Sequence, residues 1–178
     1  MSKQQEQVFR EINKDDSIAL DSLEYPSKGK DKKDKDFDFK IISIKRVTKM
    51  YKGGRRMKIS VFVAVGDKKG KVGLGIGKSD DVKTAQDKAI QKAKKTMFKI
   101  PLKGTTLPHS VEKKFGSAKI VLKPAAPGTG IIAGSSVRMI MELAGVKDVL
   151  SKILGTRNSI ANAYCAVEAL KSLRLEKL

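Results

Sequence analysis

The sequence of 178 residues contains few of the side chains that metal centres and disulfides require. It has one cysteine, Cys165, one histidine, His109, and no tryptophan. A single cysteine cannot form an internal disulfide, and one cysteine with one histidine cannot complete a Cys/His zinc site. These counts exclude a disulfide-stabilised secreted fold and a Cys/His zinc centre, and they fit a protein of a reducing compartment.

Long apolar stretches and catalytic groupings are also missing. No run of about 18 apolar residues is present, so we expect no membrane-spanning helix, and residues 1–12 lack an apolar stretch of signal-peptide length. His109 has no cysteine or acidic residue nearby, and Cys165 is placed off the apolar stripe of its predicted helix without a partner that would activate it. We therefore predict no enzyme activity, no metal and no cofactor.

Positive charge is what the sequence has in excess. It contains 38 lysine and arginine residues against 19 aspartate and glutamate residues, which gives a formal net charge of +19. Residues 1–36 carry 8 basic and 9 acidic residues, residues 37–103 carry 19 and 5, and residues 104–178 carry 11 and 5. Such a charge repels itself unless a polyanion neutralises it, and nucleic acid is the usual polyanion. A membrane surface fits less well, because no basic amphipathic helix with an aromatic face is present.

The hydrophobic pattern divides the chain into an extension and two units. Residues 1–36 are predicted to be a flexible N-terminal extension, because residues 28–36 alternate in charge without apolar side chains. The apolar residues before them could form a short helix on a partner. Residues 37–103 and 104–178 are the two folded units, and together they predict a protein of the α+β class.

The first unit is predicted to have the order β-β-β-α. Period-two alternation predicts strands over 39–49, 58–65 and 71–77, with Ile42 and Ile44 on one face of the first strand. A helix follows, capped by Ser79 and ended before Pro101. Its buried stripe is mostly alanine, so we expect the helix to lie close to its sheet. Its lysines at 88, 92, 95 and 99 line a second face that is either hydrated or in contact with nucleic acid.

The second unit is predicted to have the order β-β-α-β-α. Its elements, in chain order, are strands at 110–114 and 119–123, a helix from Ser135 or Ser136 to Gly145, a segment at 149–154, and a helix from the caps Asn158 or Ser159. The segment at 149–154 fits helical spacing as well as a short buried strand. The two helices beside it favour the strand.

The basic residues most suited to nucleic acid lie between the first two strands. The segment Lys52-Gly53-Gly54-Arg55-Arg56, preceded by Lys49, surrounds two glycines with four cations. Glycine lets the backbone approach a phosphate, and the arginine fork binds two phosphate oxygens at once. The alternative is a solvated hairpin tip. Lys68 and Lys69 form a similar but less distinctive basic turn between the second and third strands.

A glycine-rich loop in the second unit suggests two kinds of phosphate site. Gly128-Thr129-Gly130 begins a GxGxxA pattern, and Asp148 follows Gly128 by 20 residues, as in a dinucleotide fingerprint. Two prolines separate the loop from the preceding strand, and Asp148 precedes the next strand instead of ending it, so we do not expect a dinucleotide. The loop's backbone N–H groups could instead contact an RNA phosphate, and a purely structural loop is an equal alternative.

Aromatic residues are too few for base stacking to be the main mode of binding. The chain has three tyrosines and six phenylalanines, and no string typical of RNA-recognition sheets. Binding should therefore depend on phosphates and shape, which suits folded RNA.

Several motifs in fixed order resemble the small-subunit ribosomal protein five family, bacterial type. They include Lys52-Gly-Gly-Arg55, Gly70-Lys-Val-Gly-Leu-Gly-Ile-Gly-Lys78, Gly128-Thr-Gly-Ile-Ile-Ala-Gly134 and Glu142-Leu-Ala-Gly-Val146, within a similarity that covers about residues 37–173. The resemblance implies a double-stranded-RNA-binding-like first domain. It also implies that the second domain is an α/β sandwich with a left-handed β-α-β crossover, in which 149–154 is a strand.

The resemblance also implies a function. The family is a structural constituent of the cytoplasmic ribosome's small subunit, binds 16S ribosomal RNA, and supports subunit assembly and decoding accuracy. It neighbours small-subunit proteins four and eight and lies near the path by which messenger RNA enters. Residues 46–56 match the family's RNA-reaching hairpin loop, where changes can confer spectinomycin resistance. On that match RNA contact is assigned to Lys49, Lys52, Gly53, Gly54, Arg55 and Arg56.

Two other functions remain as alternatives at this point. A free double-stranded-RNA binder or RNA chaperone would leave the glycine loop of the second unit without a task. An enzyme that holds a nucleotide on that loop would lack a catalytic grouping elsewhere in the sequence.

Overall fold

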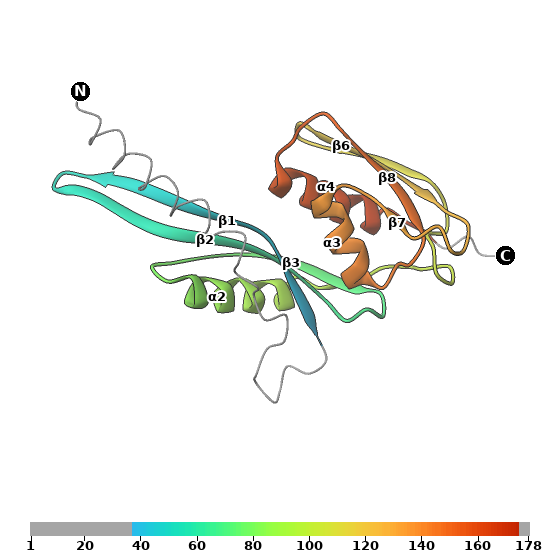
Figure 1. Cartoon of the computed structure of the whole chain (residues 1–178), viewed down its shortest axis with the longest axis horizontal. Coiled ribbons are helices and arrows are strands. Elements are labelled where there is room, and N and C mark those ends of the chain that lie inside the picture. Colours follow the sequence, from blue (N-terminus) through green and yellow to red (C-terminus); the bar gives the residue numbers. More distant parts are fainter. Residues whose placement is uncertain (1–36, 175–178) are drawn as a thin grey trace, which may run out of the picture.

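Figure 1 shows the computed structural model of the chain, which describes residues 37–174. This part of the chain forms two four-stranded sheets, with strand orders β1-β2-β3-β4 and β5-β6-β8-β7. A β-β-β-α unit precedes an α/β unit, so the predicted class is confirmed. The predicted extension, residues 1–36, lies outside the described residues.

The first unit contains the three predicted strands and the predicted helix. Its elements are β1 (Asp38–Tyr51), β2 (Gly54–Gly66), β3 (Lys71–Ser79), α2 (Val82–Lys95) and β4 (Phe98–Lys99). A turn of only two residues, Lys52 and Gly53, connects strands β1 and β2. The sequence pattern predicts a helix that continues to Pro101, but α2 ends at Lys95, and residues 98–99 form the short strand β4 on the edge of the sheet instead.

Helix α2 lies close to the first sheet because small residues face one another. Ala85, Ala89 and Ala93 are fully buried. A Cβ added to a glycine of β3 would overlap the carbonyl oxygen of the facing alanine; the three glycines are Gly73, Gly75 and Gly77. The expected close approach of the helix is confirmed, and the glycine stripe of β3 makes it possible.

Two details of the first unit correct the sequence prediction. Ile42 packs against the core shared with the second unit, whereas Ile44 packs on the α2 side, so the two do not share a face. A β-bulge at Ile42 adds one residue to the strand and shifts the alternation. The helix is capped at Asp81 instead of Ser79, because β3 continues through Ser79.

The second unit has its helices on one face of its sheet. Its elements are β5 (Val111–Phe115), β6 (Ala118–Pro124), β7 (Ile131–Ile132), α3 (Ser135–Ala144), β8 (Val149–Leu154) and α4 (Ser159–Lys171). The ambiguous segment 149–154 is a strand, as favoured. It pairs antiparallel with β6 and parallel with β7, a two-residue strand too short to predict.

Helix α4 is buried on more sides than its sequence pattern indicates. Cys165, placed off the apolar stripe by that pattern, is fully buried, which corrects the prediction. Its Sγ lies 3.3 Å from the carbonyl oxygen of Lys113, because β5 and β6 cover this side of the helix. Burial raises the pKa of the Cys165 thiol, so the group is a neutral part of the core.

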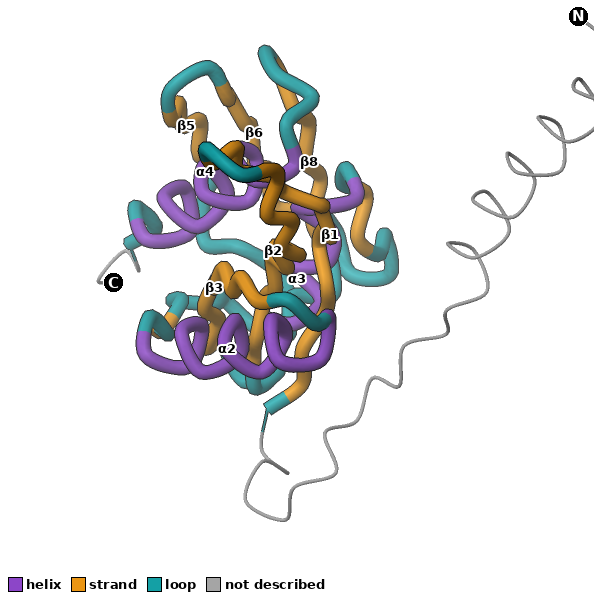
Figure 2. Tube along the Cα trace, turned by 90° about the vertical axis from the view of Figure 1, so that its left-hand side faces the viewer, coloured by secondary structure: helices purple, strands orange, loops and turns teal. Residues whose placement is uncertain are grey.

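The two units share one hydrophobic core. Phe62 of the first sheet and Ile140 and Leu170 of the second unit belong to one cluster of buried side chains. The rings of Phe62 and Tyr164 lie 5.7 Å apart between centroids. Figures 1 and 2 show the resulting layers: α2, the first sheet, α3 with α4, and the second sheet.

The turn between β2 and β3 is fixed to the end of α3. The backbone N–H groups of Lys68 and Gly70 donate to the carbonyl oxygens of Leu143 and Ala144, each over 3.0 Å. These carbonyls belong to the last turn of α3 and would otherwise lack partners. We call this contact between residues 66–70 and 142–145 the joint.

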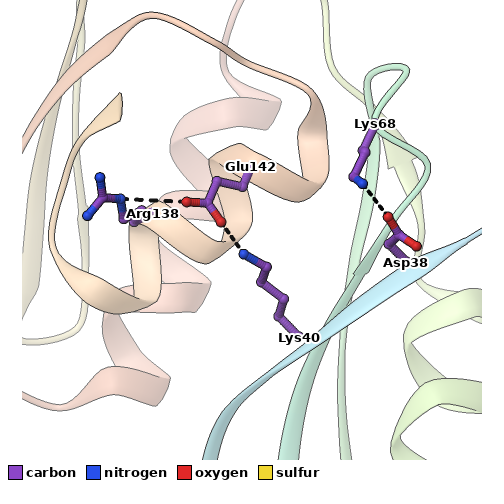
Figure 3. A network of polar contacts seen from close by, with 5 residues as sticks. All are labelled: Asp38, Lys40, Lys68, Arg138 and Glu142. Atoms are coloured by element: carbon purple, nitrogen blue, oxygen red, sulfur yellow. Dashed lines mark hydrogen bonds and ion pairs between the residues drawn. The ribbon is translucent and has the colours of Figure 1, made fainter. Parts of the chain in front are cut away.

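Ion pairs surround the joint, as Figure 3 shows. Glu142 on α3 pairs with Lys40 of β1 and lies 3.6 Å from the Nε of Arg138. The Nζ of Lys68 lies 2.5 Å from a carboxylate oxygen of Asp38. The side chains are partly exposed, so each pair adds little stability beside the shared hydrophobic core.

Candidate nucleic-acid interface

The strands β1 and β2 extend beyond the rest of the first sheet as a two-stranded ribbon. Strand β3 pairs with β2 only as far as Ile59 opposite Ser79. Beyond that pair, residues 47–58 pair only with one another, and all of them are exposed except the half-buried Val47. We call residues 47–58 the hairpin ribbon, which projects away from the packed layers in Figure 1.

All charged side chains of the hairpin ribbon are cations. They are Lys49, Lys52, Arg55, Arg56 and Lys58, and the ribbon contains no acidic residue. Exposed cations held this close repel one another, and the repulsion falls when phosphates lie among them. The structure therefore brings together all six predicted hairpin residues, Gly53 and Gly54 included.

Strand register gives the ribbon two chemically different faces. Lys49 lies opposite Arg56, and Tyr51 is on the same face, with its ring centroid 5.3 Å from the Lys49 Nζ and 5.8 Å from the Arg56 Cζ. This face continues into the side of the sheet that packs on α3. The other face carries Met50, its register partner Arg55, and Met57; the two methionines are 65% and 58% exposed.

The tip of the ribbon leaves room for a close neighbour. A Cβ built on Gly53 or Gly54 would have nothing within 4 Å, and Gly54 has a φ of +146°. The backbone of the turn is therefore open to a phosphate or a ribose. Sequence reasoning missed Tyr51 and Lys58 as members of the cationic face, and pairing the two predicted strands in register would have found both.

Lys68 and Lys69 do not join the hairpin residues. They lie in the turn at the other end of β2, whose 13 residues separate the two turns by about 40 Å. Lys68 pairs with Asp38, and the backbone of this turn forms the joint with α3. The exposed lysines of α2 also lie apart from the ribbon, so any contact they make with nucleic acid is a separate one.

The glycine loop of the second unit wraps around Asp148 of its own chain. The N–H groups of Gly128 and Gly130 both donate to Oδ1 of Asp148 over 3.0 Å, and the Thr129 N–H donates to the Ala126 carbonyl. The Gly130 N–H is the largest cause that lowers the pKa of Asp148. These three N–H groups are not offered to a ligand, so a phosphate contact at Gly128–Gly130 stays a prediction that needs other donors.

Neither a metal site nor a membrane-spanning helix is found among the described residues. Within residues 37–174, no group of three or more His, Cys, Asp or Glu side chains is arranged to hold a metal ion. No helix in that part of the chain is long and apolar enough to cross a membrane.

Comparison with known proteins agrees with this architecture. The family model "Ribosomal protein S5, N-terminal domain" matches residues 37–101, and "Ribosomal protein S5, C-terminal domain" matches residues 113–177. "Small ribosomal subunit protein uS5" of Thermus thermophilus is 52% identical over 139 residues, which covers 78% of this chain and 86% of the relative. The proteins of that name from two individual strains of the same organism match equally well. Two domain models in the expected order and this identity show that the chain belongs to the ribosomal protein S5 family.

Proposed function

We propose that this protein is a structural component of the small ribosomal subunit and that it binds ribosomal RNA through the hairpin ribbon. The ribbon carries the proposal, because five exposed cations without a carboxylate extend from a rigid base. The relatives named as small ribosomal subunit proteins support the location. The protein acts by clamping folded RNA and not as an enzyme.

The contacts divide between side chains and backbone. Lys49, Lys52, Arg55 and Arg56 neutralise phosphates of 16S ribosomal RNA, and the two arginines hold phosphate oxygens with their forks. Gly53 and Gly54 let the turn enter the space between RNA helices. Lys68 and Lys69 make a second, weaker contact at the far end of β2.

The position of this clamp gives the protein its part in translation. The core shared by both units holds the ribbon in one orientation, so RNA gripped by the ribbon is held relative to whatever the second unit contacts. We propose small-subunit proteins four and eight as those neighbours, and a position near the path by which messenger RNA enters. Subunit assembly and decoding accuracy then depend on this fixed geometry.

Two measurements test the proposal. A tagged chain is expected to sediment with small subunits through a sucrose gradient, whereas a free double-stranded-RNA binder would stay at the top. Binding of the purified chain to small-subunit ribosomal RNA is expected to weaken by about 3 to 5 log units per log unit of salt, at roughly 0.7–0.9 per neutralised phosphate. Absence from small subunits, or an affinity that does not change with salt, would overturn the proposal.

A further inference from the structure

Two methionines of the hairpin ribbon are more exposed than the other methionines among residues 37–174. Met50 and Met57 are 65% and 58% exposed. Met141 is fully buried in the shared core, and Met97 and Met139 are partly buried. Oxidants convert methionine to methionine sulfoxide, and exposure determines which methionines react first. Within the described part of the chain, a dissolved oxidant therefore reaches the two ribbon sulfurs first.

Both methionines are neighbours of Arg55 on one face of the ribbon. Met50 is the register partner of Arg55, and such cross-strand pairs have Cβ atoms about 5 Å apart. Met57 follows Arg55 by two residues, which places it on the same face of β2. Arg46 is also exposed on this face, diagonally across from Met57. The guanidinium of Arg55 therefore lies within reach of two flexible thioethers.

The second arginine of the ribbon has different neighbours. Arg56 is on the opposite face, where its Cζ lies 5.8 Å from the ring centroid of Tyr51 and its register partner is Lys49. That face of the ribbon carries no methionine. Arg55 and Arg56 are thus adjacent in the chain, equal in charge and both exposed, but only Arg55 lies beside sulfur.

Oxidation would change the surroundings of Arg55. A lone pair of the methionine sulfur attacks one oxygen of hydrogen peroxide, the O–O bond breaks and an S–O bond forms. The sulfur loses two electrons, and the proton of the transferred oxygen joins the departing hydroxide to give water. The product is a polar sulfoxide in place of an apolar thioether, and its oxygen accepts hydrogen bonds. A guanidinium has five N–H donors and no acceptor, so it is well suited to bond to that oxygen.

We propose that Met50 and Met57 are an oxidation site for peroxides, and that their sulfoxide oxygens draw Arg55 away from RNA phosphates. This inference rests on the proposed function, in which Arg55 holds a phosphate. The site acts on a chain that has not yet bound RNA, because a phosphate at Arg55 would lie beside both sulfurs and hinder the peroxide. Methionine sulfoxide reductases reverse the reaction, so the loss of RNA affinity is reversible.

Treatment of the purified full-length chain with hydrogen peroxide tests the site. Mass spectrometry of its peptides is expected to find sulfoxides at 50 and 57 before 97, 139 and 141, while circular dichroism verifies that the fold is retained. Filter binding to small-subunit ribosomal RNA is expected to show an affinity about fivefold lower after peroxide, the size of one lost polar contact. Methionine sulfoxide reductase should restore the affinity. Earlier oxidation at the other three positions, or equal affinity before and after peroxide, would overturn the inference.

Leucine variants show whether these two sulfurs cause the loss. Each chain is compared with itself before and after peroxide. In Met50→Leu with Met57→Leu the loss should disappear, because leucine has no sulfur to oxidise. In the control Met139→Leu, on α3, the fivefold loss should remain. The same loss in the chain with two leucines as in the control would overturn the inference.

Arginine variants test whether the sulfoxides act through Arg55. In Arg55→Ala, peroxide should lower the remaining affinity by less than about twofold, whereas in Arg56→Ala the loss should stay near fivefold, because interacting groups are non-additive. Equal losses in the two variants would mean that the thioethers contact RNA themselves, and would overturn the inference alone. An untreated wild-type chain that does not bind the RNA would overturn the proposed function as well.

Discussion

The two ends of strands β1 and β2 have opposite surroundings. At one end, Val61 to Val65 lie between α2 and the helices of the second unit and are at most 1% exposed on both faces. At the other end, Arg55 to Lys58 are exposed on both faces. Strand β2 therefore changes from a continuous apolar run to a mostly cationic one, Arg55, Arg56 and Lys58 around Met57, at the point where packing stops. The residues proposed to bind RNA lie where no packing requirement competes with them.

The largest effect is expected at the packed end. Gly75→Ala should destabilise the protein by about 4 kcal/mol, because the new Cβ would overlap the Ala89 carbonyl oxygen and push α2 away from the sheet. The control Gly53→Ala, which meets nothing within 4 Å at the ribbon tip, should change stability by about 0.5 kcal/mol or less. Urea unfolding followed by circular dichroism measures both. A similar cost for the two variants would contradict the contrast between packed and open ends.

The next effect concerns RNA affinity at the open end. Arg55→Glu with Arg56→Glu should weaken binding to small-subunit ribosomal RNA about 100-fold, because two phosphate contacts become repulsions. Arg157→Glu with Arg174→Glu changes the net charge equally at exposed positions of the second unit and should cost less than about fivefold. Filter binding at one fixed salt concentration compares them. Equal losses would mean that net charge, and not the ribbon, determines affinity.

A third prediction distinguishes the structural role of the Gly128–Gly130 loop from the proposed RNA-binding role of the hairpin turn at Gly53 and Gly54. Asp148→Ala should lower the midpoint of thermal unfolding by about 5 °C, because the N–H groups of Gly128 and Gly130 lose their acceptor. RNA affinity should stay within about twofold, in contrast to changes in the hairpin ribbon. Calorimetry and filter binding on the same variant test both statements. A stable variant with weakened RNA binding would assign the loop to the interface instead.

Acid should remove the contribution of Asp148. The hydrogen bond from the Gly130 N–H lowers the pKa of this carboxyl below its ordinary value of 3.8, so the folded state favours the ionised form. The stabilisation is complete above the unfolded-state pKa and is lost as pH falls through the lower folded-state value. Unfolding of the wild type and Asp148→Asn between pH 7 and pH 2 should therefore show a stability difference that is constant near neutrality and shrinks in acid. A constant difference over the whole range would contradict this origin.

The smallest effect is expected at the turn between β2 and β3. Lys69→Ala should lower RNA affinity about twofold, and Lys52→Ala at the ribbon tip about fivefold. The reason is that the far turn offers fewer free cations, since Lys68 is paired with Asp38. Titrations of labelled RNA with both variants test the order. A larger loss of RNA affinity from Lys69→Ala than from Lys52→Ala would place the main RNA contact at the turn between β2 and β3.

Local pattern was sufficient for most elements and for bringing the hairpin cations together, because alternation, capping residues and glycine turns act within a few residues. Three features could not be predicted in this way. The bulge at Ile42 shifts the alternation through pairing with β2, and the burial of Cys165 depends on strands distant in the chain. The backbone N–H groups of Gly128 and Gly130 donate to Asp148 of the same chain. The sequence spacing alone fits an aspartate that binds a ribose equally well. Each of these depends on a contact between distant segments.

The joint and the packed half of β2 determine how a force on the hairpin ribbon is transmitted to the second unit. Strand β2 runs without interruption from the ribbon tip to the turn whose N–H groups of Lys68 and Gly70 bond to the end of α3. A push on the tip therefore acts on a free arm, residues 54–58 of β2, about 17 Å long, because the strand is packed on both faces from Val61 to Val65. Under the proposed function, movement of RNA bound at the tip would be transmitted to the second unit through the packed part of β2 and the joint.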